Sequence, residues 1–370
     1  MPRLFHGDLT TLLPSGRLVK YHVAMNQERR GIAGGGNWII DRLYICDRWP
    51  QEETLSNILA EERGTGGAPY NCLLDIAKFG PDAGGEAIPL EGVGLIGDDP
   101  NGRFIQADCT AHGIDTSALV VTDQAPTSYT NVMVVQDSGR RTFFHNRGAN
   151  ALFGPEHVPV DQLKARLVHF GYLLLLDRMD EDDAEFGTTA ARILKAFQDA
   201  GIETSIDVVS EDSDRFPRVV KPALKYTDYA ILNEFEAGKT TGHDIKPDGK
   251  VDIEALRASA KDLLDLGVGR LVCVHMPAGG YVLTTGGQEV WQPSLQLPQG
   301  YIKGAAGAGD AFCAGMLFGI HEGWEIDKSL RLAVCSAAMS LSQPGCTEAC
   351  TNLTDTLALA DKYPFQPAII

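Results

Sequence analysis

The most informative stretch of this chain is Gly304-Ala305-Ala306-Gly307-Ala308-Gly309-Asp310, which an apolar run from Ala311 to Ile320 follows. Small residues leave backbone N–H groups uncovered. A helix that begins near Asp310 would also point its unpaired N–H groups and the positive end of its dipole at the same place. The stretch therefore predicts an anion site at the start of a helix.

A carboxylate at the mouth of such a site repels the anion, so its useful role there is to accept a proton from an attacking nucleophile. This suggests phosphoryl transfer to a hydroxyl group, with Asp310 as the base. The alternative is a tight turn in which Asp310 only caps the helix. The stretch by itself leaves both interpretations open.

Length and charge narrow the class of protein. The chain has 370 residues, which predicts one large α/β domain with an appendage or two domains. Its 32 basic and 49 acidic residues give a formal net charge of −17, which disfavours nucleic acids and anionic membranes as partners. A bound nucleotide would then need backbone N–H groups, a metal ion or a few well-placed cations, which fits a site built from glycine.

The cysteines and the chain start bear on the compartment. The eight cysteines are scattered with no Cys-x-x-Cys pair, and Cys346 and Cys350, the closest in sequence, make a weak metal site. Reduced, buried thiols are the better interpretation. No segment has the roughly 18 uninterrupted apolar residues of a membrane span, and the first residues lack the apolar core of a signal peptide. We expect a cytoplasmic protein.

The order of elements indicates the fold. Residues 1–33 are polar and irregular, an N-terminal extension to which we assign no role. A strand is expected over 34–45, a helix over 70–79, and a hairpin between Ser128 and Phe144 that turns at Asp137-Ser138-Gly139. Further strands are expected at 167–170, 202–209, 229–232 and 271–275, and helices at 184–197 and 253–266.

This alternation of strands and helices predicts right-handed βαβ units and a mostly parallel sheet with helices on both faces. Ligands of such sheets collect at the C-terminal ends of the strands.

Four segments, in this order, resemble the PfkB (ribokinase-like) family of carbohydrate kinases, and the resemblance covers about residues 34–345. The family's Gly-Asn-x-x-x-Asp, Gly-Gly-x-x-x-Asn, Asn-x-x-Glu and Gly-Ala-Gly-Asp motifs match residues 36–41, 66–71, 233–236 and 307–310. The resemblance implies a ribokinase-like three-layer α/β/α core over residues 34–370. It also implies a small β-strand lid contributed by about 42–60 and 125–146, and a homodimer that pairs through exposed lid strands.

The resemblance also implies an ATP-dependent sugar kinase that uses Mg²⁺. Its catalytic residues would be Asp310 as the base and Gly307, Ala308 and Gly309 as the anion hole. Its substrate-binding residues would be Asn37, Asp41, Gly66, Gly67, Asn71 and Arg147. Its nucleotide-binding residues would be Asn233, His275, Gly280, Gly307 and Gly309, and Glu236 would hold Mg²⁺ through water.

The residue types fit these roles but also admit plainer ones. Short amide and carboxylate groups match the hydroxyls of a sugar, although each also suits a turn or cap. Glu236 is an oxygen ligand suited to Mg²⁺, yet it is also the third residue after Asn233, a good helix N-cap. Arg147 fits a solvated arginine equally well, and His275 fits a strand-end residue.

Two departures from the family pattern have consequences. Gly304-Ala305 replaces the usual Asp-Thr, so the family's monovalent-cation site loses a carboxylate, and we expect a weak response to potassium. Pro277-Ala278-Gly279-Gly280 replaces a Gly-x-x-Gly loop, and proline has no N–H to offer a phosphate. These departures keep a non-catalytic sugar or nucleotide sensor as the alternative, with a nucleoside kinase less favoured.

A dinucleotide-binding dehydrogenase is a third class to consider. The glycines of residues 92–97 match its pattern, but Asp98-Asp99-Pro100-Asn101-Gly102 follows where that fold needs a helix. This sequence therefore argues against a dehydrogenase.

Overall fold

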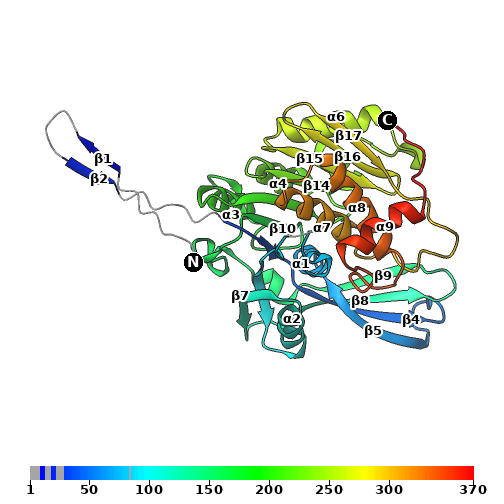
Figure 1. Cartoon of the computed structure of the whole chain (residues 1–370). Helices are drawn as coiled ribbons and strands as arrows, with labels where there is room; N and C mark the ends of the chain where they lie inside the picture. The colour runs from blue at the N-terminus through cyan, green and yellow to red at the C-terminus, as the bar shows by residue number, and fades with distance from the viewer. Residues whose placement is uncertain (1–8, 13–17, 22–28, 83–84) are drawn as a thin grey trace.

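The short apolar segments of the chain form one large twisted sheet (Figure 1). The computed structural model describes residues 9–12, 18–21, 29–82 and 85–370. Across the sheet the strands are β17 (Glu289–Pro293), β16 (Gly279–Thr284), β15 (Leu271–Met276), β14 (Tyr229–Asn233), β13 (Glu203–Val208), β10 (Leu167–Leu173), β3 (Ile32–Gly36), β6 (Leu90–Gly97) and β7 (Ile114–Thr122). The run from β15 to β7 is parallel, whereas β16 and β17 are antiparallel. The predicted parallel sheet is confirmed.

Helices cover both faces of this sheet because its strands are apolar on both sides. In β15, Leu271 and Cys273 pack into one core and Val272 and Val274 into the other. The first core faces α1 (Ala68–Phe79), α2 (Pro100–Ala111), α7 (Ala308–His321), α8 (Ile326–Ser340) and α9 (Leu353–Lys362). The second faces α3 (Thr189–Asp199), α4 (Phe216–Leu224), α5 (Glu234–Thr241) and α6 (Ile253–Asp265). The result is the expected three-layer α/β/α arrangement.

A second, smaller sheet lies at one end of the molecule (Figure 1). Its strands, in order, are β5 (Ile58–Gly66), β4 (Ile39–Cys46), β8 (Ser128–Val135) and β9 (Arg141–Asn146). β4 and β8 run parallel, and the two outer pairs are antiparallel. The expected hairpin turn is present, since the N–H of Gly139 donates to the carbonyl of Val135 at 2.8 Å.

The strand expected over 34–45 proves to be two strands in two different sheets. The chain leaves the large sheet after Gly36, which has a φ of 124°, and enters the small sheet at Ile39. Between them the Trp38 side chain is fully buried, and its indole N–H donates to the carbonyl of Val93. A break of this kind is invisible in the apolar pattern because both strands are apolar.

The glycines of residues 92–97 have a packing role. A Cβ on Gly92 or Gly94 would lie within 3 Å of the Trp38 ring. The helix that we expected to be missing is in fact present, because α2 begins at Pro100 with Asp99 as its N-cap. That reason for setting the dehydrogenase aside was therefore wrong, and the crowding by Trp38 replaces it.

Smaller elements correct two further predictions. The helix expected from residue 184 begins at Thr189, because β11 (Asp182–Asp183) and β12 (Gly187–Thr188) pair first and Thr188 caps the helix. Within the extension expected to be irregular, β1 (Leu9–Leu12) pairs antiparallel with β2 (Leu18–Tyr21).

In the part of the chain that the structure describes, no helix combines the length and apolar character needed to cross a membrane.

Candidate active site

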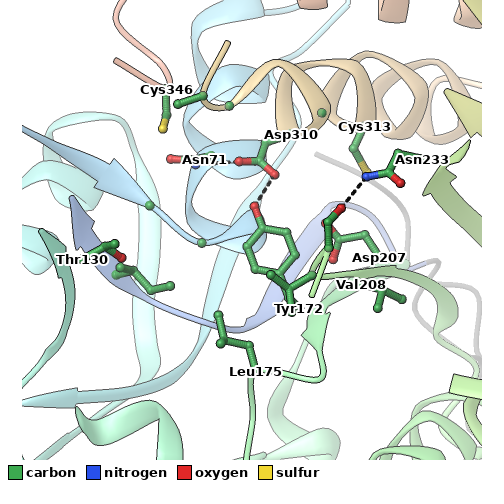
Figure 2. A pocket seen from close by; sticks show the side chains of 18 of the residues that line it. Asn71, Thr130, Tyr172, Leu175, Asp207, Val208, Asn233, Asp310, Cys313 and Cys346 are labelled. Atoms are coloured by element: carbon green, nitrogen blue, oxygen red, sulfur yellow. Dashed lines mark hydrogen bonds between the residues drawn. The ribbon is translucent and has the colours of Figure 1, made fainter. Parts of the chain in front are cut away.

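The C-terminal ends of four parallel strands border a cavity of about 470 Å³ (Figure 2). Tyr172 comes from β10, Asp207 from β13, Asn233 from β14 and His275 from β15. The small sheet closes the opposite side with residues that include Asp41 and Thr130. The cavity therefore lies where the strand order predicted a ligand site.

Asp310 lies in the first turn of α7 and is only 6% exposed. Figure 2 shows Asn71 and Tyr172 pointing at its carboxylate: Asn71 Nδ2 donates to Oδ2 at 2.7 Å, and the Tyr172 hydroxyl donates to Oδ1 at 2.6 Å. Burial raises the pKa of Asp310, and the bonds from Tyr172 and Asn71 oppose this rise. The result is an oriented carboxyl whose pKa has moved toward neutrality, as a general base requires.

The start of α7 has the geometry of an anion site. Gly307 is the N-cap with a φ of 74°, and a Cβ there would lie 2.5 Å from the carbonyl oxygen of Cys346, so only glycine fits. The N–H groups of Ala308, Gly309 and Asp310 belong to the first turn, where a helix offers them no internal acceptor. Gly307, Gly309 and Asp310 all line the cavity.

The residues expected to bind sugar partly converge on this cavity. Asp41, Gly66, Gly67 and Asn71 line it. Burial raises the pKa of Asp41 to about 7, although a hydrogen bond with Thr130 opposes the rise. Gly67 has a φ of 92°, and a Cβ there would lie 2.3 Å from the carbonyl oxygen of Asn37. The turn before α1 thus lies directly against the backbone of Asn37, which leaves no room for a side chain at Gly67.

The side chain of Asn71, expected to bind sugar, makes two hydrogen bonds within the protein. Its Nδ2 donates to Asp310, and its Oδ1 accepts from the Thr65 hydroxyl at 2.6 Å. The amide therefore orients the carboxyl as well as bordering the cavity.

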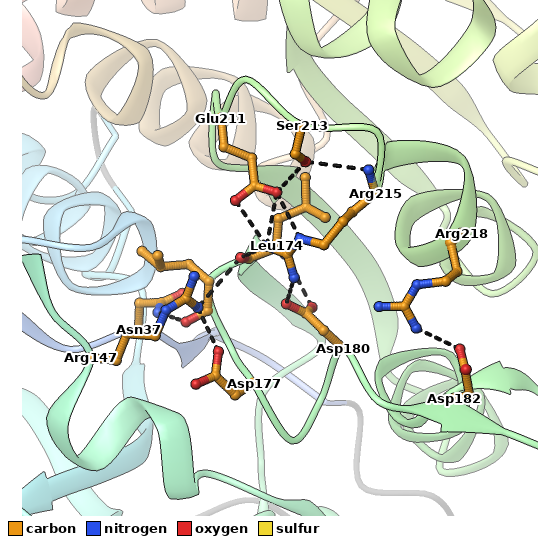
Figure 3. A network of polar contacts seen from close by, with 11 residues as sticks. Asn37, Arg147, Leu174, Asp177, Asp180, Asp182, Glu211, Ser213, Arg215 and Arg218 are labelled. Carbon is orange, nitrogen blue, oxygen red and sulfur yellow. Dashed lines mark hydrogen bonds and ion pairs between the residues drawn. The ribbon is translucent and has the colours of Figure 1, made fainter.

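Asn37 and Arg147, both expected to bind substrate, lie outside the lining of this cavity. Figure 3 shows the polar contacts that they make instead. Asn37 Nδ2 donates to the carbonyl of Leu175, and its Oδ1 accepts from the N–H of Tyr172. Arg147 donates to Asp177 at 2.7 Å and to the carbonyl of Leu174 at 3.5 Å. Both side chains thus hold the loop that follows β10, and Asn37 also holds the end of the strand that carries Tyr172.

Arg215 strengthens the same loop. It donates to the carbonyl of Leu174 at 2.6 Å and pairs with Glu211 (Figure 3). Sequence reasoning did not single out this arginine.

Asn233 and Glu236 form a reciprocal cap at the start of α5. Asn233 Oδ1 accepts from the Glu236 N–H at 2.9 Å, and Glu236 Oε2 accepts from the Asn233 N–H at 2.9 Å. Glu236 Oε1 also accepts from Ser210 and from Asn233 Nδ2. Both residues line the cavity, and burial raises the pKa of Glu236 to about 8. The capping role and a place at the ligand site therefore coexist.

The nearby carboxyl of Asp207 fits a magnesium ion better than Glu236 does. Its Oδ1 is buried without a hydrogen-bond partner, whereas both oxygens of Glu236 are engaged. A buried acceptor without a partner is costly, and a hard cation or its water would satisfy it. Burial raises the pKa of Asp207 to about 6, and His169 opposes the rise.

His275 separates the first cavity from a second one of about 590 Å³. Its ring stacks on Phe312 at 4.9 Å, and burial lowers its pKa to about 4, so the imidazole is neutral near pH 7. Apolar side chains such as Leu295, Leu297 and Val334 line the second cavity, and Gly309 borders both.

Gly280, expected to contact the nucleotide, packs against core side chains. A Cβ there would lie 2.7 Å from the Phe312 ring and 2.9 Å from the Leu330 side chain. Gly280 borders neither cavity.

Tyr172 and Asp207 are the site residues that sequence reasoning missed. Asp207 lies inside the strand expected over 202–209, and Tyr172 comes two residues after the strand expected over 167–170. The rule that ligands lie at C-terminal strand ends would have found both.

Comparison with known proteins agrees with this geometry. The family model for pfkB family carbohydrate kinases matches residues 36–353. The chain belongs to the pfkB family of carbohydrate kinases. It is a phosphotransferase with an alcohol group as acceptor.

Individual family members are similar at a lower level. An ATP-dependent ribose-1-phosphate kinase from Halopiger xanaduensis is 26% identical over 90% of this chain and 98% of its own length. A 5-dehydro-2-deoxygluconokinase from Shouchella clausii is 24% identical over 85% of this chain and 90% of its own. Among solved structures, Arabidopsis thaliana ribokinase complexed with ribose and ATP gives a TM-score of 0.71 at 20% identity, covering 90% of this chain and 98% of that one.

Proposed function

We propose that this pfkB kinase transfers the γ-phosphoryl group of ATP to a hydroxyl of a small, uncharged carbohydrate. The observation that carries the proposal is the Asp310 carboxyl, buried at the cavity beside the N-terminus of α7 and oriented by Asn71 and Tyr172. A protein that only senses a ligand has no need of a base at an anion site.

The roles follow from the geometry. Asp310 in its ionised form accepts the proton of the sugar hydroxyl as its oxygen attacks the phosphorus. The N–H groups at the start of α7 donate to the transferred group, on which negative charge is concentrated. The small sheet covers the cavity as a lid and excludes water, which would otherwise compete as acceptor.

The two cavities suggest how the substrates are divided. The sugar fits the cavity with Asp41, which offers a polar wall. The nucleotide base fits the second, more apolar cavity beyond His275. The phosphate chain of the nucleotide would then pass from the second cavity into the first beside Gly309, which borders both cavities. This division places the γ-phosphate beside Asp310.

Mg²⁺ fits the carboxylates of this site. Asp207 would hold it, with the capped Glu236 behind a shell of water, and the ion would neutralise phosphate charge when bound. An E. coli protein solved in complex with ATP and Mg²⁺ has a TM-score of 0.70 with this chain, and this likeness supports the use of Mg²⁺ in general. The chain contributes the oriented carboxyls, which repel one another without a cation.

The charge of the cavity favours an uncharged sugar. Among the described residues that line it are Asp41, Asp207, Glu236 and Asp310, with no lysine or arginine. A phosphorylated or acidic sugar would bring a second anionic group to a wall that offers it no cationic side chain. We therefore favour a neutral sugar over the substrate in the name of the ribose-1-phosphate kinase relative.

We also propose a homodimer that pairs through the small sheet. Its edge strand β5 exposes Ile58 and Leu59, and Phe143 and Phe144 of β9 are exposed as well. An uncovered apolar edge strand invites pairing, and a second copy offers a matching edge. The mass of the particle in solution tests this.

Formation of ADP from ATP, measured with a panel of neutral sugars, sugar acids, sugar phosphates and nucleosides, tests the function. We expect turnover with a neutral sugar and little with the charged ones. Tight sugar binding without turnover would support the sensor instead, and turnover of a nucleoside would support a nucleoside kinase.

A further inference from the structure

Behind the cavity wall lies a buried cluster that phosphoryl transfer does not use. It consists of Cys72 of α1, His169 of β10 and Cys313 of α7. One ligand atom from each lies within 4.8 Å of the other two, and all three residues are buried. Two sulfurs and an imidazole nitrogen are the ligands that zinc prefers in proteins.

One separation within the cluster matches that of a tetrahedral ion, and a second one does not. Cys313 Sγ lies 3.6 Å from His169 Nε2 and 3.8 Å from Nδ1. A zinc–sulfur bond of about 2.3 Å and a zinc–nitrogen bond of about 2.0–2.1 Å, at a tetrahedral angle, separate the two ligand atoms by about 3.6 Å. Because the sulfur lies almost equally far from both ring nitrogens, it must shift toward the Nε2 side of the ring before the two atoms can share an ion.

The surroundings of His169 also suit a ligand. His169 Nδ1 lies 3.1 Å from the Ser205 hydroxyl, which fixes the ring and leaves Nε2 for a metal. Asp207 Oδ2 lies 3.7 Å from Nε2, and Oδ1 of the same carboxyl is buried without a partner. That carboxylate is available for the fourth position.

An ion can reach the cluster through the cavity, because Cys313 and Asp207 both line it. We propose that Cys72, His169 and Cys313, completed by Asp207, form a site for Zn²⁺ or a similar thiophilic dication. The ring of His169, whose pKa the neighbouring Asp207 raises to about 10 against the effect of burial, must also give up a proton. Binding therefore releases two thiol protons and one imidazolium proton to solvent as two zinc–sulfur bonds and one zinc–nitrogen bond form, with no change of oxidation state.

Occupation of this site would inhibit the enzyme, an effect that rests on the proposed function. Cys72 Sγ now donates to the backbone carbonyl of Asp310 at 3.2 Å, and a metal-bound thiolate no longer can. The ion would also take Asp207 away from Mg²⁺. Zinc would therefore disturb both the base and the magnesium site.

Titration of the chelator-treated full chain with Co²⁺ tests the site directly. We expect a thiolate-to-cobalt charge-transfer band and intense tetrahedral d–d bands that saturate at one ion per chain and disappear when Zn²⁺ is added. The variants Cys72→Ser and Cys313→Ser should each weaken binding at least about a hundredfold, beyond the usual effect of an outer-shell change. Cys109→Ser, which alters a buried thiol of α2, should leave the spectrum unchanged.

The wild-type spectrum decides the question even if a variant fails to fold. Absence of a thiolate band, or a full band in both Cys72→Ser and Cys313→Ser, would overturn the proposal. Zinc inhibition in the presence of excess Mg²⁺ is a separate measurement. If no sugar is turned over, the proposed function fails while the cobalt spectrum still reports on the metal site.

Discussion

Asn71 Nδ2 lies 2.7 Å from Oδ2 of Asp310, although the two residues are 239 positions apart in the sequence. This hydrogen bond joins the first turn of α1 to the first turn of α7. The helix that borders the expected sugar site is thus bonded to the proposed base. Sugar recognition and chemistry are therefore coupled through one side chain.

This coupling predicts the behaviour of Asn71→Ala. The change removes the donor to Oδ2 of Asp310 and leaves the Thr65 hydroxyl with only the Thr347 hydroxyl at 3.4 Å, at a cost of roughly 1–3 kcal/mol. We expect sugar affinity to fall about fivefold or more, and turnover to fall as well, while ATP affinity changes little. Titration calorimetry and initial rates measure these effects, with the exposed Asn57→Ala as the control. Equal losses of sugar and nucleotide affinity would contradict the assignment.

The Tyr172 hydroxyl predicts a shift in the pH profile. Its hydrogen bond stabilises the charged form of Asp310 and lowers its pKa. In Tyr172→Phe the pKa of Asp310 should rise, so a higher pH is needed to ionise the base. We expect the acidic limb of kcat to move to higher pH, with the plateau also reduced. A limb that stays in place or moves to lower pH would show that another group titrates there.

The Asp41 carboxyl predicts a pH-dependent stability. Its pKa is about 7 when folded and near 3.8 ordinarily, so between these values the folded state holds a proton that the unfolded state has lost. Stability therefore falls as pH rises through this window and is unaffected by this group below it. Asp41→Asn removes this titrating group and the loss of stability that it causes. The free energy of unfolding of the variant, relative to that of the wild type, should therefore increase from pH 5 to pH 8. Denaturant unfolding at both pH values measures this, and a constant difference would refute it.

Much of this site could be predicted from the sequence. The residues whose positions were not predicted make contacts with partners that are distant in the sequence. Asp310, Asp41 and Gly67 stand in short motifs whose chemistry is local, and they line the cavity. Asn37 stands in such a motif too, but its amide bonds to a loop 138 residues away, which spacing does not reveal. Arg147 was likewise paired with an acidic residue that no motif marks.

The same distinction between local patterns and distant contacts applies to the fold. Strands and helices of the parallel sheet follow from their apolar pattern, whereas the break after Gly36 depends on the burial of Trp38 against Gly92 and Gly94. Only the tertiary structure brings those residues together.

The surroundings of Gly304 predict a weak potassium response. A Cβ on Gly304 would lie 2.7 Å from Arg141 Nη2 and within 3 Å of the carbonyl oxygens of Gln343 and Pro344. The space beside Gly304 is thus bordered by a guanidinium as well as by two carbonyls, and we expect a monovalent cation to gain little there. Initial rates in potassium, sodium and a bulky organic cation at equal ionic strength should agree within a few-fold. Much greater stimulation by potassium would mean that a cation site persists.

The central claim is that Asp310 is the base for phosphoryl transfer, and Asp310→Asn tests it most directly. The amide keeps the shape of the side chain but cannot accept the proton. Turnover of the purified variant should fall roughly a hundredfold to ten-thousandfold, the usual contribution of a positioned general base, while sugar and ATP still bind. The exposed Asp212→Asn serves as the matched control and should leave turnover unchanged. Turnover of Asp310→Asn within a few-fold of the wild type would contradict the account.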